Sequence, residues 1–513
     1  MMEAVPMKES VLPLLVFLVP TVCGVVSLVV ARFRAFHGEW AFLGLLGTLG
    51  ISIWITYEVV VKGYILVAYH KNFYVDGLSA LLELLGSCMG ILIVLYSLKY
   101  VPIRLRDHPD VPGRLSVYYG QLLLFLGMMN WTCATNNIVM LYVSVEATTL
   151  ATAFLVTFYW TRESLEAGYK YLLLVTIGTT FALLGLSLIY CAAVGLPFMA
   201  GKRVLLITEL NKAAKAMHES TVLLACALLV AGFGTKAGLV PFHAWLPDAH
   251  AEAPAPISAL LSGIVIKVGA YALTRTVTVF TPYYPPVVIF TAIMASASMV
   301  IGILMALVQD DIKRMLAYSS VSQMGYVVEG LGLGTYLGIY GGLFHLMNHT
   351  IVKALLFLCA GAVVYATGRR RLSELGGLSR VMPTTAFCFI VGALAIGGMP
   401  PFNAFMSKIT LFTAAAEAGL LWAAIIAIFT GLLTIACFVR AAYLIFWGQP
   451  RVALASSSNP GPEGVERRGI PAGMLAAMVI LTLMTIFLGV YPSFAHPLLD
   501  SATRCILSLL GVR

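Results

Sequence analysis

The chain has 513 residues, of which 60% are hydrophobic and only 11% are charged, and its formal net charge is +9. The mean hydropathy is +0.93. A soluble domain carries about 25% charged residues, so this composition excludes an ordinary soluble enzyme and indicates a polytopic membrane protein. The 9 cysteines stand singly, without a CxxC or other ligand spacing, and no phosphate-binding or dinucleotide-binding glycine loop occurs. We therefore expect no metal site and no cofactor in this chain.

Apolar runs long enough to cross a bilayer recur along the whole sequence. A membrane-spanning helix needs about 20 apolar residues, and about fourteen such helices are predicted. In chain order they lie near residues 11–31, 40–61, 78–98, 115–134, 138–160, 170–194, 221–246, 255–279, 286–308, 312–333, 336–366, 383–415, 420–447 and 471–495. The first run follows a short polar start without a small-residue cleavage site, so we expect a retained helix rather than a signal peptide.

Three longer polar segments separate the spans, at 99–114, 200–219 and 449–470. The second segment is predicted to be an amphipathic stretch that lies along the membrane surface. The third is rich in Ser, Pro and Gly between Ser456 and Glu466, a composition that predicts a disordered loop.

The basic residues outside the spans are distributed unevenly between the two sides of the membrane. Most fall in loops that follow odd-numbered helices, as Arg104, Arg314 and Arg370 do, and fewer fall on the other side, where we count Arg275. The positive-inside rule then places these loops in the cytoplasm and both termini outside a prokaryotic plasma membrane. Because the basic residues do not gather on one soluble face, no nucleic-acid partner is expected.

Charged and titratable residues also fall inside the predicted spans, where each charge costs about 2.5–3.5 kcal/mol to insert. A chain that keeps so many of them is expected to use them. They are Glu146, Lys236, Lys267, Glu329, His345, His349, Lys353, Lys408 and Arg440. Glu329 and Arg440 stand near helix ends, where a long side chain can reach the interface, so a snorkelling position and a functional role both stay open for these two residues.

Glu146 lies near the centre of the fifth predicted span, and Lys236 lies in the seventh. An isolated carboxylate at this depth would neutralise, whereas a nearby lysine would keep it charged. A Glu–Lys pair in a medium of low dielectric constant is costly and easily opened. We therefore expect the pair to act as a switch, with a static pair that pins two helices as the alternative.

Three titratable residues of the eleventh span, His345, His349 and Lys353, follow one another at i, i+4 and i+8. This spacing places them on one face of a helix, with Asn348 nearby. Histidine both accepts and donates protons near neutral pH, so the stripe predicts a proton relay assisted by bound water. Hydrogen bonding between helices is the alternative. No carboxylate or cysteine is close in the sequence, so a metal site is not expected.

Two spans combine glycine and proline in a way that breaks a helix. GLVPFHAW begins at Gly238 and includes Pro241, and GMPPFNAF begins at Gly398 and includes Pro400 and Pro401. Backbone groups freed inside a membrane are tolerated only where protein or a wet cavity covers them. The breaks therefore predict functional positions in helices seven and twelve.

The two broken spans are five helices apart, so they run in opposite directions. This arrangement is typical of inverted repeats, here helices 4–8 and 9–13. Lys236 and Lys408 lie beside the breaks, and His243 and Asp248 are secondary candidates after the first break. The predicted fold is therefore an all-α membrane bundle with four parts. They are the N-terminal helices (1–114), a first five-helix repeat (115–280), a second five-helix repeat (281–450), and a loop with a C-terminal helix (451–513).

Two long segments carry a family resemblance: GFGTKAGLVPFHAWLPDAHAEAPAPISALLSGIVIKVGAY and DIKRMLAYSSVSQMGY. They resemble the antiporter-like subunits of respiratory complex I, a pattern shared with Mrp-type antiporter subunits and membrane-bound hydrogenases. The resemblance covers about residues 75–450. It implies that Glu146 and Lys236 form a coupled pair and that Lys267 is the central relay lysine. It further implies that His345 and His349 continue the relay and that Lys408 is the exit-side charge. EATTLATAFLV around Glu146 resembles the component of group 4 hydrogenase and formate hydrogenlyase complexes.

The expected function is a proton-translocating subunit without redox centres of its own, driven by a neighbouring oxidoreductase. The expected partners are other membrane subunits and iron–sulfur or nickel–iron peripheral subunits. Three alternatives stay open: a subunit of an Mrp-type sodium/proton antiporter, the membrane subunit of an inorganic-carbon uptake system with a zinc-bearing soluble partner, and a passive anchor that retains the charges as relics.

Overall fold

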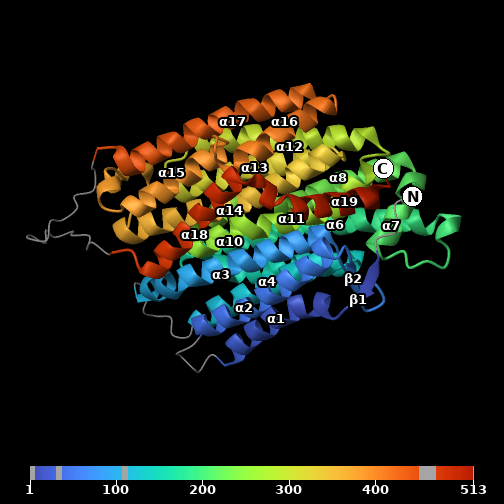
Figure 1. Cartoon of the computed structure of the whole chain (residues 1–513), viewed down its shortest axis with the longest axis horizontal. Coiled ribbons are helices and arrows are strands. Elements are labelled where there is room, and N and C mark those ends of the chain that lie inside the picture. The colour runs from blue at the N-terminus through green and yellow to red at the C-terminus, as the bar shows by residue number, and fades with distance from the viewer. Residues whose placement is uncertain (1–5, 31–36, 107–113, 450–468, 512–513) are drawn as a thin grey trace, which may run out of the picture.

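The computed structural model of the chain describes residues 6–30, 37–106, 114–449 and 469–511. Its helices lie side by side in one bundle, with axes that follow the long axis of the molecule (Figure 1). Both termini lie at one end of this bundle, which we call the termini end. We call the opposite end, which carries Glu252, Asp311 and Arg370, the loop end.

Helices make up most of the described chain, and a small sheet lies at the termini end. The strands are β1 (Met7–Glu9), β2 (Ile65–Ala68) and β3 (Phe73–Val75), with β1 parallel to β2 and β2 antiparallel to β3. The helices are α1 (Leu12–Val29), α2 (His37–Thr56), α3 (Gly77–Arg106), α4 (Arg114–Ala134), α5 (Ile138–Val156), α6 (Arg162–Val194), α7 (Ile207–Ala213), α8 (Glu219–Ala237), α9 (Trp245–Glu252), α10 (Ala255–Leu260), α11 (Ile266–Thr276), α12 (Pro285–Leu307), α13 (Ile312–Gly332), α14 (Tyr336–Thr367), α15 (Pro383–Gly397), α16 (Asn403–Glu417), α17 (Leu421–Ala442), α18 (Ala472–Val490) and α19 (His496–Leu510).

Several helices begin at a side chain that caps their free amide groups. The side chains of Asn137 and Asp311 each accept hydrogen bonds from two backbone N–H groups in the first turns of α5 and α13. Thr161 and Thr335 each accept one at the starts of α6 and α14. Because the first amides of a helix have no partner within it, such caps fix where the helix starts.

The chain is a multi-pass membrane protein. Among the described residues, 11 helices are long and apolar enough to cross a bilayer. The predicted spans near 115–134 and 312–333 are also helical, as α4 and α13, but they fall outside these 11. The predicted span at 383–415 divides into the shorter helices α15 and α16. The mostly helical membrane fold expected from the composition is therefore confirmed.

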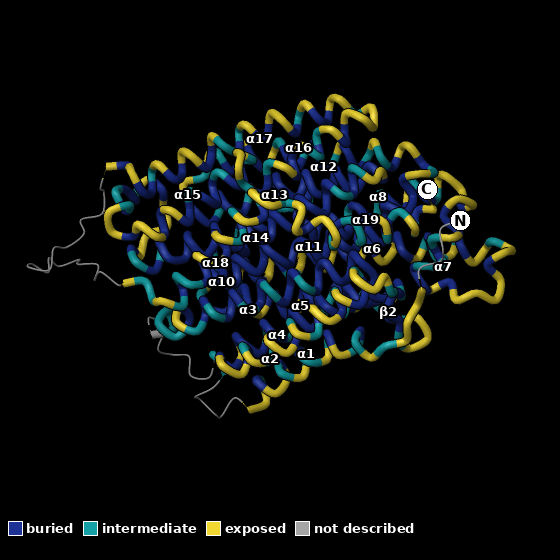
Figure 2. Tube along the Cα trace, in the orientation of Figure 1, coloured by how far each residue is buried: buried dark blue, intermediate teal, exposed yellow. Residues whose placement is uncertain are grey.

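The centre of the bundle is formed by α14 and by the segment from α10 to α11. Every residue from 255 to 280 is buried, and α14 is buried along most of its length, whereas only five of the 18 residues of α1 are buried. Figure 2 shows this distribution, with buried residues in the middle and exposed residues along the outer helices. Charged side chains on α11 and α14 therefore lie as far from the surrounding solvent or lipid as this molecule permits.

The helices α8 and α11 approach each other very closely near the centre. A Cβ atom added to Gly269 of α11 would lie 2.5 Å from the backbone nitrogen of Ala237 in α8. Only glycine permits this approach, and small residues at helix contacts are typical of membrane bundles. The contact brings the segment that carries Lys236 against the segment that carries Lys267.

Some elements were not predicted from the sequence. The strands of the small sheet have three or four residues each, too few to show an alternating pattern. The helix α19 follows the last span and buries Leu499, Ala502 and Ile506 on one face. The helix α3 extends to Arg106, into the segment expected to be polar. The predicted disordered loop at 449–470 lies almost wholly outside the described residues.

Candidate proton-transfer site

Two helices are interrupted inside the bundle, at the two glycine–proline segments. The helix α8 ends at Gly238 and α15 ends at Gly398, with φ angles of +77° and +87°, a left-handed conformation that glycine adopts without steric cost. The segments that follow contain the cis peptide bonds Val240–Pro241 and Pro400–Pro401. A Cβ atom on Gly398 would lie 2.8 Å from Cδ of Lys408, so this glycine also makes room for a charged side chain.

Lys236 lies in the last turn of α8, immediately before the first interruption, and is fully buried. Its ammonium group donates hydrogen bonds to Oγ1 of Thr149, at 2.8 Å, and to the hydroxyl of Tyr171, at 2.9 Å. The carboxyl end of a helix carries a partial negative charge, which favours a cation at this position. The helix end and two hydroxyl groups thus hold Lys236 in the interior.

Glu146 lies one helical turn before Thr149 on α5 and accepts a hydrogen bond from Oγ1 of Thr179 on α6. Among the ion pairs of the described residues, none joins Glu146 to Lys236. The expected direct contact is therefore open in this structure, and the hydroxyl of Thr149 takes the place of the carboxylate beside Lys236. Hydroxyl acceptors satisfy the ammonium group without the desolvation of a second charge.

Lys267 and His349 are in direct contact at the centre of the bundle. Nζ of Lys267 lies 2.5 Å from Nδ1 of His349 and 2.5 Å from the backbone oxygen of Ser262. Both side chains are almost fully buried. The segment Leu261–Val265 between α10 and α11 is a π-helical turn, a local widening that is frequent at functional sites. The first turn of α11 thus places the buried amine of Lys267 against the imidazole of His349 on α14.

His345 continues this contact one turn further along α14. Its ring centroid lies 6.4 Å from that of His349, and its two nitrogens lie 3.1 Å from Oγ of Ser407 and 3.1 Å from Oε1 of Gln323. Asn348 also donates to Ser407, at 3.2 Å. Both nitrogens of His345 are therefore hydrogen bonded. Within the described residues, no three His, Cys, Asp or Glu side chains gather as a metal site.

Lys408 follows Ser407 on α16 and lies beside the second interruption. Its ammonium group donates to the backbone oxygens of Ile396 and Gly397, at 2.9 and 3.1 Å, the free carbonyl groups at the end of α15. Nζ of Lys408 also lies 5.0 Å from the ring centroid of Tyr326, a distance within the range of cation–π attraction. Each interruption therefore has a buried lysine beside it, but Lys236 is held by side-chain hydroxyls and Lys408 by the backbone oxygens at the end of α15.

Lys353, the third member of the predicted stripe, turns away from this row. It donates to the backbone oxygen of Leu316, at 2.9 Å, and to Oγ of Ser319, both on α13. Its Nζ atom lies 5.3 Å from the ring centroid of Phe438. The structure thus brings His345 and His349 into one row with Lys267, and places Lys353 in a separate buried contact nearer the loop end.

Comparisons with known proteins identify the family to which this chain belongs. Residues 135–434 match the transmembrane family described as NADH:quinone oxidoreductase/Mrp antiporter. This chain belongs to that family. It is 36% identical over 425 residues to NADH-quinone oxidoreductase subunit N of Desulforudis audaxviator, with 81% of each chain covered. It is 34% identical over 387 residues to the hydrogenase-4 component F homolog of Methylacidiphilum infernorum, with 74% of this chain and 80% of that protein covered.

A solved structure of an archaeal respiratory membrane complex, the membrane-bound sulfane sulfur reductase, contains a chain of the same fold. That chain superposes with a TM-score of 0.84 at 27% identity, and the match covers 98% of this chain and 100% of the other. The family and the fold together show an antiporter-like membrane subunit, as the two long motifs predicted.

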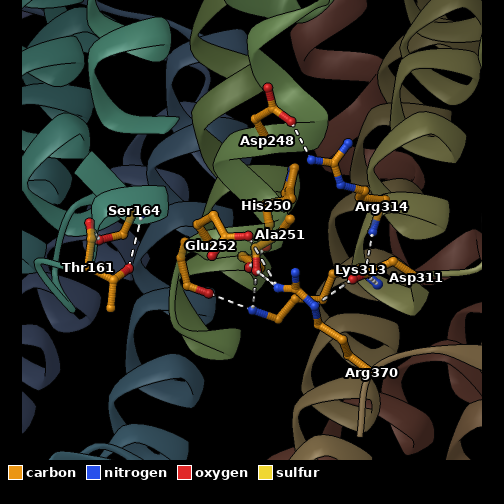
Figure 3. Close-up of polar contacts among 12 residues, drawn as sticks. Thr161, Ser164, Asp248, His250, Ala251, Glu252, Asp311, Lys313, Arg314 and Arg370 are labelled. Atoms are coloured by element: carbon orange, nitrogen blue, oxygen red, sulfur yellow. Dashed lines mark hydrogen bonds and ion pairs between the residues drawn. The ribbon is translucent and has the colours of Figure 1, made fainter. Parts of the chain in front are cut away.

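In this antiporter-like subunit, the secondary candidates lie outside the buried row. Asp248 of α9 is partly exposed and accepts from Arg314 at 2.6 Å, as Figure 3 shows, and from Lys170 at 3.3 Å. His243 lies in the interrupted segment, with its ring centroid 6.1 Å from that of Tyr318. The structure thus assigns Asp248 to an ion-pair cluster at the loop end.

Figure 3 also shows a histidine that the sequence interpretation missed. His250 of α9 is fully buried beside this cluster, and neither of its ring nitrogens has a hydrogen-bond partner among the described residues. Its ring stacks on Phe357 of α14, with centroids 4.5 Å apart. We expected a loop between two spans at this position. The continuation of the broken helix through Trp245–Glu252 is the signal that could have identified it.

A second buried pair of charges lies between α3 and α11. Arg275 donates to both carboxylate oxygens of Asp76 at 2.7 Å, and its Nε donates to the hydroxyl of Tyr271 at 3.0 Å. Arg275, which the charge count places with the loop after the eighth predicted span, is therefore buried inside the protein. The reason is that α11 continues to Thr276 inside the protein, and Asp76, which is distant in sequence, supplies the counter-charge.

Proposed function

We propose that this chain is a proton-translocating subunit of a multi-subunit membrane complex, in which a row of buried amines and imidazoles carries the protons. The contact between Lys267 and His349 carries the proposal most directly. A lysine and a histidine held 2.5 Å apart in a fully buried position form a donor–acceptor pair ready to share one proton. Ionisable groups at this depth in a membrane are typical of proton pathways.

The proposed route begins at Lys236 and proceeds through Lys267, His349 and His345 to Lys408. Each step moves one proton: a charged donor becomes neutral and the next group becomes charged. The close approach of α8 and α11 supports the step from Lys236 to Lys267, which water would bridge. Ser407, hydrogen bonded to His345 and adjacent to Lys408, supports the last step.

Glu146 is the proposed control of the first step. When its carboxylate approaches Lys236, the attraction favours the charged amine, and when the pair separates the amine releases its proton more readily. The hydrogen bonds from Lys236 to Thr149 and Tyr171 support a separated arrangement of the pair. A conformational change in a partner subunit would shift the balance between the two arrangements.

The proposed architecture keeps about fourteen spans and two inverted repeats, with the divisions at 115–280 and 281–450. The helices α8 and α15 support this reading. Each ends at a left-handed glycine followed by a Pro-containing segment, and each holds a buried lysine at that end. The orientation that follows from the basic loops has the loop end in the cytoplasm and both termini outside a plasma membrane.

The proposed partners are other membrane subunits and redox subunits with iron–sulfur or nickel–iron centres. The names of the two similar proteins, one a subunit of an NADH-quinone oxidoreductase and one a hydrogenase-4 component homolog, support this proposal. Purification of the chain from native membranes in mild detergent, followed by identification of the associated proteins, tests it. Co-purification of redox subunits is expected, and a complex without any would contradict it.

The relay itself is tested by replacement of Lys236 with Met in the intact complex. Proton translocation into reconstituted liposomes is expected to be lost, while assembly of the complex is retained. The exposed Lys202 provides the matched control, and Lys202→Met should translocate protons like the wild type. Unchanged translocation by Lys236→Met would contradict the proposed function.

A sodium/proton antiporter subunit is the second candidate, because the family description includes Mrp antiporters. It predicts that proton movement through the reconstituted complex depends on a sodium gradient and needs no redox reaction. Redox-driven proton movement in the absence of sodium would favour the first candidate.

A further inference from the structure

Glu329 is a buried carboxyl group near the end of α13 that the proposed relay does not use. Its residue is 2% exposed, and neither carboxyl oxygen has a hydrogen-bond partner among the described residues. The position near a helix end allowed a snorkelling side chain, but the burial shows that this carboxyl does not reach the surface. An unpaired carboxylate in the interior is strongly disfavoured, and no fixed partner among the described residues holds this carboxyl group in its ionised form.

Glu329 lies one helical turn after Tyr326, the residue of α13 whose ring contacts the last lysine of the row. Tyr326, one turn earlier on α13, places its ring 5.0 Å from Nζ of Lys408. Residues three apart on a helix point to the same side, with Cβ atoms about 5–6 Å apart. A Cβ atom on Gly330 would lie 2.5 Å from Cδ2 of Leu411, three residues after Lys408 on α16. Along the bundle axis, in the direction in which α16 runs, Glu329 thus lies slightly further than Lys408.

The direction from Lys408 to Glu329 is toward the termini end. The helix α13 begins at the loop end, where Asp311 pairs with Arg370, and its last residue, Gly332, precedes α14, whose first residue, Tyr336, bonds to Asp500 of α19. Glu329 therefore lies between Lys408 and the surface that carries both termini.

A small apolar cluster separates Glu329 from that surface. Leu333, one turn beyond Glu329, packs with Ala414 and Ala415 of α16 and with Ala424 of α17. The partly buried side chains of Val288, Leu337 and Leu420 pack against this cluster. A carboxyl group on the inner side of a thin apolar layer is positioned to receive a proton from the interior and to release it outward.

We propose that Glu329 is the terminal proton acceptor of this subunit, taking the proton from Lys408 and releasing it at the termini end; the inference rests on the proposed proton-translocating function. In the transfer, the charged amine of Lys408 and the carboxylate of Glu329 become a neutral amine and a neutral carboxyl group, directly or through water. The carboxyl group then gives the proton to water and returns to the carboxylate. Tyr326, His345, His349 and Lys353 are further titratable groups that interact with Lys408 or lie against its neighbours.

The test replaces Glu329 with Gln, which keeps the size of the side chain but cannot carry a proton. In the intact complex reconstituted into liposomes, Glu329→Gln is expected to lower proton translocation at least about a hundredfold, the lower end of the effect of a lost proton-transfer group. Glu329→Asp keeps a carboxyl group and is expected to retain more activity. Glu417→Gln, at an exposed glutamate on the same end of the bundle, should leave translocation unchanged.

Infrared difference spectroscopy of the wild-type complex during turnover provides a second measurement. A residue with a purely structural role would give no signal in it. A band of a carboxyl group that gains and loses a proton is expected, shifted in Glu329→Asp and absent in Glu329→Gln. Wild-type translocation by Glu329→Gln, together with its loss in Lys236→Met, would overturn the role of Glu329 and leave the proposed function standing. Wild-type translocation by Lys236→Met would overturn both. If Glu329→Gln fails to assemble, a wild-type spectrum identical to that of Glu329→Asp would overturn the inference.

Discussion

The ammonium nitrogen of Lys267 lies 2.5 Å from Nδ1 of His349, although 82 positions of sequence separate the two residues. One side chain comes from α11 and the other from α14, and both helices are buried along most of their length. The contact joins two groups that each titrate, in a place where bulk water cannot supply or remove protons freely. It divides the proposed relay into a part that precedes this contact and a part that follows it.

Replacement of Lys267 with Met is expected to abolish proton translocation, because the methionine fills the space of the lysine stem but offers no proton to His349. The complex should still assemble, since the substituted position is apolar on most sides. Translocation by reconstituted complexes is the measurement. Lys71→Met, at an exposed lysine of the termini end, serves as the control. Translocation by Lys267→Met at the wild-type rate would show that protons bypass this contact.

Removal of the hydroxyl that holds Lys236 should weaken both stability and transport. Thr149→Val preserves the shape of the side chain and leaves the ammonium group with one acceptor fewer, at a cost of about 1–3 kcal/mol for the unsatisfied group. The measurement is the thermal unfolding midpoint in detergent, followed by translocation. Thr180→Val is the matched control, because that exposed threonine bonds only within its own helix. Equal midpoints for the two variants would contradict the assigned contact.

The pair of Asp76 and Arg275 is expected to be structural and strongly coupled. Asp76→Asn leaves a buried guanidinium group without its counter-charge, which should lower stability by about 3–5 kcal/mol. Asp500→Asn removes the carboxylate from a pair with the exposed Arg504, and the loss should be at most about 1 kcal/mol. Chemical or thermal unfolding of both variants in detergent provides the comparison. A similar loss for both would show that the buried pair contributes no more than the surface pair.

The glycine at the second interruption offers a test of how Lys408 is positioned. Gly398→Ala introduces a Cβ atom into a left-handed backbone and against Cδ of Lys408, whereas Gly419→Ala introduces one into a left-handed backbone with no atom within 4 Å. The backbone strain, about 1–2 kcal/mol, is common to both variants. Only Gly398→Ala should therefore lower translocation. Equal translocation by the two variants would show that transport does not depend on how this turn positions Lys408.

Much of the site could be predicted from the sequence because charges inside apolar runs are conspicuous. Lys236, Lys267, His349 and Lys408 stand out against the low charge content of the spans, and all four are buried in the structure. Glycine and proline marked both interruptions, since few other residues fit a left-handed turn at the end of a helix. The long motifs then identified the family, which the comparison with known proteins confirmed.

Other features depend on contacts between distant segments, and no local pattern contains them. Glu146 and Lys236 were expected in direct contact, but hydroxyl groups from Thr149 and Tyr171 hold the lysine instead. Any nearby polar group can satisfy an ammonium ion, so the choice among them depends on how α5, α6 and α8 pack.

The sequence by itself determined that this protein folds in a membrane, to which family it belongs, and which titratable residues lie inside the spans, because each depends on residue type and local spacing. The tertiary structure alone decided which of these groups meet. The regular spacing of His345, His349 and Lys353 placed all three on one helix face, yet Lys353 bonds to α13 while His349 meets Lys267. A helix face of this length contacts several neighbours, and only the packing of those neighbours decides which one receives each side chain.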